Sequence, residues 1–327
     1  MPDTRIIAKQ LKEKLAGGLI PAVPVMFDRA GQFQERAHAS YVEYMREQPI
    51  AGVAVWAHTG RGLHLSKQVA RRVIEDWREA LPNKPLIAGV GAASKISDPI
   101  EATEATLSMA ADAAQYGADA GLAYPPTWLR EHEERDRLIV EHHARLDQLG
   151  WPIILFYLYE AAGGISYNAS VLDELLSLPN VVGIKMATLD SVVTYQDVAR
   201  HVLTRHPDKL LITGEDRFLA YSLRRGANAA LIGMGAVCCE LQAELLESHF
   251  EGRAERFLEL SDAVDELAEV LFVTPMEGYI GRILCAVAKL GIIPEEAAYD
   301  PWGPSLSESE TEKIETALNT VTASYAR

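Results

Sequence analysis

The sequence predicts an α/β protein built on a (β/α)8 TIM barrel with additional C-terminal helices. Eight short apolar runs alternate with longer segments of helical period between residues 17 and 235. Such alternation implies right-handed crossovers and a parallel sheet. A doubly wound dinucleotide fold would need G-x-G-x-x-G between a strand and a helix, and the nearest approach, Gly89-Val90-Gly91, continues with Ala and Ser. A closed barrel is therefore the predicted architecture.

The predicted elements follow in chain order. The strands are Leu19–Val25, Gly52–Ala57, Pro85–Gly91, Ala120–Tyr124, Ile153–Tyr157, Val181–Lys185, Leu210–Thr213 and Ala229–Gly233. The helices between them include Lys67–Ala80, Pro99–Tyr116, Glu131–Leu149, Ala169–Leu178, Ser191–Thr204 and Arg217–Arg225. Gly117 and Gly226 each follow a helix and precede a buried strand, where a left-handed C-cap is needed.

Both ends of the chain extend this barrel. The N-terminal MPDTRIIAKQLKEKL is amphipathic and charged, without the continuous apolar stretch of a signal peptide, so we expect a helical extension. Helices are also predicted beyond the eighth strand, at Leu241–Phe250, Ala254–Leu271, Gly278–Leu290 and Ser307–Ala323. The predicted division is a catalytic barrel over residues 1–237 and a helical region packed on it over residues 238–327.

Composition narrows the classes of function. Of 327 residues, 48% are hydrophobic and 24% charged, which excludes wholesale disorder. The net charge of −15 opposes binding to nucleic acid or an anionic membrane surface. No apolar run approaches the ~20 residues that span a bilayer. The three cysteines, Cys238, Cys239 and Cys285, are expected to be buried, reduced thiols. A soluble cytoplasmic protein is the expectation.

Side chains at the carboxyl ends of barrel strands are the candidates for chemistry. Lys185 ends the sixth strand after four apolar residues, where burial would lower its pKa and leave an amine able to form a Schiff base; the alternative is a lysine that extends to solvent. Tyr157 ends the fifth strand and is either a proton shuttle or a packing aromatic. After the second strand, His58 is a candidate acid or base, and Thr59 and the amides around Gly60 are candidate carboxylate donors.

These motifs resemble the dihydrodipicolinate synthase/N-acetylneuraminate lyase superfamily of class I aldolases and lyases. Gly183-Ile184-Lys185 matches the family's G-[IV]-K, whose lysine forms a Schiff base with pyruvate or another 2-oxo acid. Tyr157 lies 28 residues before Lys185, the family's spacing for its proton-transfer tyrosine. The resemblance extends from Gly18 to Ser307 and implies a TIM barrel that needs no metal and no organic cofactor.

Several positions depart from the family pattern. The loop G-[TS]-T-G-E is here Ala57-His58-Thr59-Gly60-Arg61, which keeps only the second hydroxyl. Trp128 stands where dihydrodipicolinate synthases place a tyrosine that crosses a dimer contact, and a tryptophan there is similar to hydratase-aldolases that release pyruvate from aryl substrates. Ala162 replaces the arginine that holds the second substrate's carboxylate. The resemblance therefore points to a divergent member and away from dihydrodipicolinate synthase itself.

Other residues carry weaker indications. Glu215, in Gly214-Glu215-Asp216, matches a segment near the substrate of sugar-acid members and is either a substrate contact or a solvated acid. Gly233 is either a close approach to a carboxylate or a packing glycine. Histidines 132, 142 and 143 lack metal-ligand spacing and are expected on a solvated helical face, so no metal site is predicted.

The predicted function is a class I lyase or aldolase that acts on a pyruvate-type 2-oxo acid through a Lys185 Schiff base. Tyr157 and His58 would transfer protons, and Thr59, Gly60, Trp128, Glu215 and Gly233 would contact the substrate. Two alternatives stay open: a dehydratase of a deoxy-keto sugar acid that uses the same imine, and a non-catalytic binding or regulatory homologue. The resemblance also implies a homo-oligomer, a dimer or more specifically a tetramer, with Trp128 near the contact.

Overall fold

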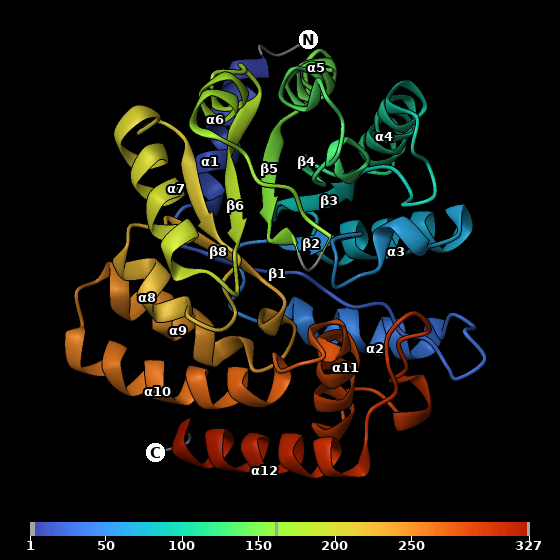
Figure 1. The fold of residues 1–327 in the computed structure, drawn as a ribbon. Coiled ribbons are helices and arrows are strands. Elements are labelled where there is room, and N and C mark those ends of the chain that lie inside the picture. Colours follow the sequence, from blue (N-terminus) through green and yellow to red (C-terminus); the bar gives the residue numbers. More distant parts are fainter. Residues whose placement is uncertain (1–3, 161–162, 326–327) are drawn as a thin grey trace.

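Eight parallel strands form a nearly closed barrel in the computed structural model, which describes residues 4–160 and 163–325 (Figure 1). The strands pair in the order β1-β8-β7-β6-β5-β4-β3-β2, and a parallel bridge between Ala22 and Ala54 joins the two ends. Their bounds are β1 Leu19–Pro21, β2 Val53–Val55, β3 Leu86–Val90, β4 Ala120–Ala123, β5 Ile153–Leu158, β6 Val181–Ala187, β7 Leu210–Thr213 and β8 Ala229–Ile232. The predicted (β/α)8 TIM barrel with additional C-terminal helices is confirmed.

Helices alternate with these strands and then continue to the end of the chain. Those before and within the barrel are α1 Thr4–Leu15, α2 Glu35–Arg46, α3 Lys67–Ala80, α4 Pro99–Gln115, α5 Arg135–Asp147, α6 Ala169–Leu176, α7 Val192–Arg205 and α8 Leu219–Arg224. Those after it are α9 Cys239–Phe250, α10 Ala254–Leu271, α11 Tyr279–Lys289 and α12 Glu308–Tyr325. Helix α2 was not among the predicted helices.

Local sequence signals explain where several of these helices begin and end. Asp98, Asn168 and Ser191 cap α4, α6 and α7 by accepting hydrogen bonds from backbone amides three residues further on. Gly117 and Gly226 adopt φ of 106° and 101°, the positive values that a glycine C-cap allows. The two predicted helix ends before buried strands are thus confirmed.

Strand residues alternate between the barrel interior and the layer under the helices. On β5, Phe156 and Leu158 belong to the inner cluster, whereas Leu155 and Tyr157 belong to the outer one. Buried side chains of α1, among them Leu11 and Leu15, belong to the inner cluster, and α1 contacts β6. The N-terminal helix therefore covers one end of the barrel interior.

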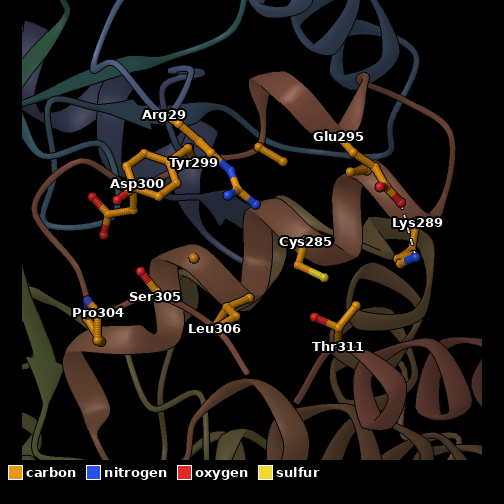
Figure 2. Close-up of a pocket in the computed structure, with 13 residues that line it drawn as sticks. Arg29, Cys285, Lys289, Glu295, Tyr299, Asp300, Pro304, Ser305, Leu306 and Thr311 are labelled. Carbon is orange, nitrogen blue, oxygen red and sulfur yellow. Dashed lines mark hydrogen bonds and ion pairs between the residues drawn. The ribbon is translucent and has the colours of Figure 1, made fainter. Parts of the chain in front are cut away.

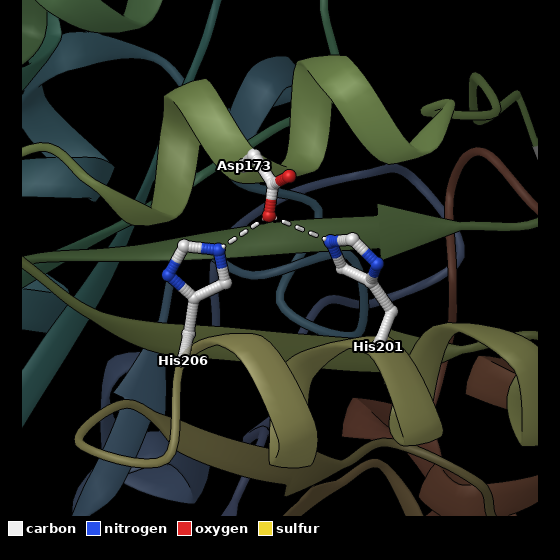
Figure 3. Close-up of side chains that lie close together, drawn as sticks. All are labelled: Asp173, His201 and His206. Atoms are coloured by element: carbon white, nitrogen blue, oxygen red, sulfur yellow. Dashed lines mark hydrogen bonds and ion pairs between the residues drawn. The ribbon is translucent and has the colours of Figure 1, made fainter.

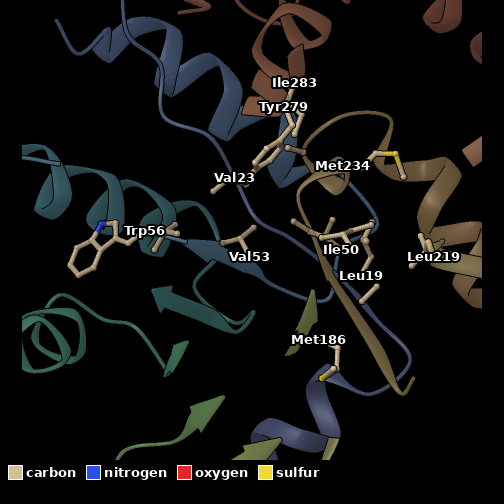
Figure 4. Close-up of a cluster of buried hydrophobic side chains, with 14 of the residues drawn as sticks. Leu19, Val23, Ile50, Val53, Trp56, Met186, Leu219, Met234, Tyr279 and Ile283 are labelled. Carbon is tan, nitrogen blue, oxygen red and sulfur yellow. The ribbon is translucent and has the colours of Figure 1, made fainter. Parts of the chain in front are cut away.

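The C-terminal helices share the outer core with the barrel. One continuous cluster of buried side chains contains Leu19, Met234 and Leu219 of the barrel together with Tyr279 and Ile283 of α11 (Figure 4). In Figure 1, α10, α11 and α12 lie side by side on one flank, and α10 contacts both α9 and α12. Within the described residues, this cluster spans position 237, and α11 packs against the barrel through it.

Two of the three histidines expected on a solvated face are buried instead. His142 and His143 lie on the inward side of α5, where Nδ1 of His142 is 3.0 Å from Thr103 Oγ1 and Nδ1 of His143 is 2.8 Å from the Ile139 carbonyl. Burial lowers the pKa of His143 to about 4. The expectation failed because the charged residues around them mask the apolar stripe of α5. His132 is exposed, before the helix begins.

Among the described helices, none is long and apolar enough by itself to cross a membrane. The pair α10 and Met276–Lys289 passes a length and composition test together, but bends by 106° at the break. Both helices contribute to the core cluster described above.

Candidate active site

Lys185 lies inside the barrel near the carboxyl end of β6. It pairs with Phe156 on β5 and Ile212 on β7, and only 6% of the residue is exposed. Its Nζ lies 4.4 Å from the centre of the Phe156 ring. A Cβ at Gly214 would lie 2.5 Å from Lys185 Cε, so the glycine after β7 provides the space for this side chain. Burial lowers the pKa of Lys185, while the charges of Asp216 and Glu215 act in the opposite direction.

A small cavity of about 60 Å³ surrounds the amine at the barrel mouth. One part of its lining is apolar, from Phe156, Leu158, Ala187, Leu189, Phe272 and Met276. The other part is polar, from His58, Thr59, Tyr159, Lys185, Asp216, Glu277 and Tyr279. Residues 272–279 come from the C-terminal region, so this region completes the cavity. A few polar groups converging in an apolar recess are typical of a small-molecule site.

Asp216 supplies the buried acid of the cavity. Its Oδ1 accepts a hydrogen bond from the backbone amide of Met234 at 2.7 Å. Burial raises the pKa of Asp216, and the backbone hydrogen bonds from Met234 and Gly233 and the charge of Lys185 lower it in part. An amine and a carboxyl group with opposed shifts in one cavity are suited to exchange protons near neutral pH.

Tyr279, at the start of α11, joins His58 and Thr59. Its Oη lies 3.0 Å from His58 Nδ1 and 3.0 Å from Thr59 Oγ1. The Tyr279 ring stacks on His58 at 5.9 Å and on Phe272 at 5.0 Å between ring centres. Burial, with the charges of Arg61 and Lys185, lowers the pKa of His58 to about 3, so its imidazole is neutral at pH 7. The hydroxyl, phenol and imidazole thus form one hydrogen-bonded chain, in which each group can donate or accept.

The loop that holds His58 and Thr59 has left-handed backbone at two positions and is held by an ion pair to the C-terminal region. Trp56 and Arg61 have φ of 53° and 52°, left-handed values that cost energy for residues other than glycine. Arg61 donates through Nε and Nη2 to the carboxylate of Asp300, with a shortest distance of 2.5 Å, and both side chains are nearly buried. This bidentate pair connects the loop to the C-terminal region and keeps Arg61 out of the cavity lining.

A second and larger cavity lies among the C-terminal elements. Figure 2 shows Arg29, Cys285 and Lys289 around it, and its volume is about 580 Å³. It shares no lining residue with the cavity around Lys185. Asp300 lines this second cavity while it binds Arg61, so the cavity borders the ion pair that anchors the loop after β2.

Comparisons with known proteins place this geometry in a family. The model of the dihydrodipicolinate synthetase family matches residues 15–321. The chain belongs to this family. A 4-hydroxy-tetrahydrodipicolinate synthase of Prochlorococcus marinus is 28% identical over 265 residues, which cover 79% of this chain and 81% of that protein. The predicted superfamily resemblance is thus confirmed, at an identity that fits a divergent member.

Solved structures of the dihydrodipicolinate synthase family share the fold. A monomeric dihydrodipicolinate synthase variant superposes with a TM-score of 0.83 at 20% identity, covering 95% of this chain and 98% of that one. A prophage protein of the same family from Escherichia coli K12, solved in complex with pyruvate, has a TM-score of 0.80 at 19% identity and covers 93% of this chain and 98% of that one.

The structure does not bring Tyr157, the tyrosine at the family spacing, to Lys185. Tyr157 pairs with Met186 on β6, and its ring packs at 5.7 Å from Tyr167 in the outer cluster. Phe156, one residue earlier, is the inward residue that covers the lysine. The spacing of 28 residues does not reveal which face of β5 a residue occupies. A shift of one residue along a strand moves a side chain from the barrel interior to the outer face.

The other predicted residues divide between the cavity and its surroundings. His58, Thr59 and Gly233 line the cavity together with Lys185. Glu215 is fully buried behind it and accepts hydrogen bonds from Thr188 N and Oγ1 and from Leu189 N, so it holds the loop after β6 and is neither a solvated acid nor a cavity residue.

Gly60 and Trp128 also lie outside the cavity lining. The Gly60 amide donates to the Ala57 carbonyl at 2.9 Å, which turns the loop. Trp128, in the single turn Thr127–Leu129, packs edge-on to His142 at 5.2 Å. Ala162, which replaces the family arginine, lies outside the described residues.

Sequence reasoning missed Asp216 and Tyr279. Asp216 lies three residues after the end of β7, so the rule that strand ends carry chemistry would have found it. Tyr279 lies 94 residues after Lys185, at the start of a helix that was predicted only to pack on the barrel. No local pattern marks it, because its position depends on how α11 docks.

Replacing Asp216 with asparagine tests the electrostatic environment of the lysine. Asp216→Asn removes the negative charge that favours the ammonium form and keeps an oxygen for the Met234 amide, so the pKa of Lys185 should fall further. The measurement is carbamylation of Lys185 by cyanate, which reacts with neutral amines, followed by peptide mass across pH. The reactivity midpoint should move to lower pH, and Asp208→Asn, an exposed acid, is the control. A midpoint that stays or rises would contradict the coupling.

Proposed function

We propose that this protein is a class I lyase or aldolase that binds a pyruvate-type 2-oxo acid as a Schiff base on Lys185. The observation that carries the proposal is a buried amine with a lowered pKa, near a strand end in the cavity at the barrel mouth. Membership of the dihydrodipicolinate synthetase family supports it, as does pyruvate bound in the prophage relative. The residues of the cavity suffice for imine chemistry, so the proposal needs no cofactor.

The proposed reaction begins at the amine. Neutral Nζ attacks the C2 carbonyl of the 2-oxo acid, and the carbonyl oxygen takes up protons and leaves as water to give an iminium. A base removes the proton of the C4 hydroxyl, the C3–C4 bond breaks, and its electron pair moves into an enamine while an aldehyde departs. C3 then takes up a proton, and water hydrolyses the imine to release pyruvate and free Lys185. Thr59 and the backbone around Gly233 are the proposed contacts of the substrate carboxylate.

The proton transfers are assigned to Tyr279 and His58. Tyr279 lines the cavity and bridges His58 and Thr59, whereas Tyr157 packs in the outer core. Phe156 contributes an apolar face beside Lys185, where it desolvates the amine and moves no proton. The relay thus reaches the lysine from the loop after β2 and from α11.

An apolar or aromatic aldehyde is the proposed second substrate. Phe272, Met276 and Leu158 form much of the cavity wall, and Arg61 is held by Asp300. A carboxylated aldehyde such as aspartate semialdehyde therefore lacks an arginine in the cavity lining to bind it bidentately. A sugar-acid dehydratase would use the same imine, but the apolar lining favours cleavage that releases an apolar aldehyde.

Trapping with borohydride tests the Schiff base. Wild type treated with pyruvate and borohydride should gain the mass of one reduced pyruvate, mapped to Lys185, because only a free amine forms the imine. Lys185→Met should gain none. Lys209→Met is the matched control, since burial also lowers the pKa of Lys209 at the opposite end of β7, and it should retain the adduct.

Two outcomes would change this assignment. An adduct that maps to another lysine, or none in wild type, would refute the Schiff-base proposal. An adduct without cleavage of any 2-oxo acid tested, including aryl-substituted ones, would favour the non-catalytic homologue. Efficient condensation of pyruvate with aspartate semialdehyde would contradict the proposed substrate class.

A pair of tyrosine variants tests the proton relay. Tyr279→Phe keeps the ring between His58 and Phe272 and removes only the bridging hydroxyl, so kcat should fall by roughly 10²–10⁴-fold, the range for one general acid or base. Tyr157→Phe should change kcat by less than about threefold, because its hydroxyl lies outside the cavity lining. If both variants keep the KM and the unfolding midpoint of wild type, a fall in kcat reports a loss of proton transfer and not a loss of folding. The reverse order of effects would return the role to Tyr157.

We also propose that the chain assembles as a homo-oligomer, most simply a tetramer, as the resemblance implied. Trp128 supports this, since it is only half-buried and part of it stays exposed on the single chain. Light scattering at micromolar concentration should give a mass of two or four chains. A monomer would remove the proposal, and the monomeric synthase variant with the same fold makes this outcome a real one.

A further inference from the structure

A cluster of metal-ligating side chains lies outside the barrel, where α6 faces the end of α7. His201 Nε2 is 2.9 Å and His206 Nε2 is 2.8 Å from the same oxygen, Oδ1 of Asp173 (Figure 3). One ligand atom from each residue lies within 4.8 Å of the others. All three side chains are partly buried, with exposed fractions of 19%, 12% and 35% for His201, His206 and Asp173.

This cluster is remote from the cavity around Lys185. His206 follows the last turn of α7 and lies four residues before β7 begins, so it belongs to the amino end of the strands. Asp173 lies on α6, which leads into the amino end of β6. Lys185 occupies the carboxyl half of β6. The chemistry of the cluster is therefore separate from the proposed lyase site.

We propose that Asp173, His201 and His206 form a zinc site that ties α6 to α7. Imidazole nitrogens suit zinc, nickel and copper, whereas magnesium and calcium prefer oxygen ligands. Zinc binds nitrogen and oxygen at roughly 2.0–2.2 Å, which separates tetrahedral ligand atoms by roughly 3.4 Å. The two His–Asp separations of 2.8 and 2.9 Å need to widen by about half an ångström. The third separation, between the two histidines, starts at 4.8 Å or less, and side-chain rotation can adjust it.

The protonation pattern of the cluster is compatible with binding. Oδ1 of Asp173 lies within hydrogen-bond distance of Nε2 of both histidines. An ionised carboxylate only accepts, so both Nε2 atoms carry a proton in this arrangement. When zinc enters, each ring keeps its proton on Nδ1 instead, and both Nε2 lone pairs become ligands. Water completes the tetrahedron from the solvent side. Arg205 lies 3.5 Å from Asp173 Oδ2 and is 65% exposed, so it is free to turn toward solvent.

Calorimetry on tag-free, chelator-treated protein tests the site. When wild type is titrated with zinc chloride at pH 7.5, each chain should bind one zinc ion at this cluster. The double variant His201→Gln/His206→Gln keeps amide donors for Asp173 but loses both nitrogen ligands. Loss of a residue that only hydrogen-bonds to a metal ligand already lowers metal affinity by about 10–100-fold. Loss of two ligands themselves should therefore weaken zinc binding by roughly 100-fold or more. His132→Gln, an exposed histidine elsewhere, is the matched control and should bind as wild type does.

Thermal unfolding gives a second readout. Zinc at 100 times its Kd should raise the wild-type Tm by about 3–6 °C, because it binds only the folded chain. Magnesium should not raise it, and the double variant should show no zinc-dependent rise. Pyruvate adduct formation on Lys185 should be the same with and without zinc, which keeps this test separate from that of the proposed function. Wild type that binds no zinc, or a double variant that binds it equally well, for example through the free cysteines, would overturn the site.

Discussion

An amine held away from water at the end of β6 is the constraint on which the rest of the site depends. A charged lysine in an apolar recess is costly, so the surroundings decide which form it takes. Phe156 covers Nζ, and Gly214 leaves room for the chain that carries it. Asp216 and Glu215 prevent complete loss of the charge. In the proposed mechanism this balance allows the amine to be neutral when it attacks the carbonyl, and its nitrogen then carries the positive charge of the iminium.

The C-terminal region contributes to the cavity as well as to the core. Tyr279 stands at the start of α11 and reaches both His58 and Thr59, while Asp300 holds Arg61 at the other end of the same loop. The loop after β2, with its left-handed Trp56 and Arg61, is thus fixed between two contacts from one region. Strained backbone persists only where its surroundings over-determine it, and here these contacts contribute.

Much of this arrangement follows from sequence, and the rest depends on details that sequence does not carry. The alternation of short apolar runs with helices was sufficient for the barrel, and a lysine at the end of such a run was sufficient to find the buried amine of the cavity. The sequence did not show which side chains of β5 point into the barrel. Ile153–Leu158 is apolar on both faces and lacks the alternation of polar and apolar residues that would mark the inner ones. Tyr279 and Asp300 reach the site through tertiary docking of distant segments, which no local spacing encodes.

The position of the proposed relay on α11 determines which substitutions would disturb it. In a barrel, side chains on strands are locked by the register of the sheet, whereas a helix docked across the mouth can adjust its angle with little effect on strand pairing. A relay that depends on α11 is therefore more sensitive to the packing of Phe272 and Ile283 than to substitutions in β5. In the proposed mechanism an apolar residue at the inner end of β5 is tolerated, because proton transfer runs through Tyr279 and His58. The apolar part of the lining then favours an aldehyde without a charge of its own.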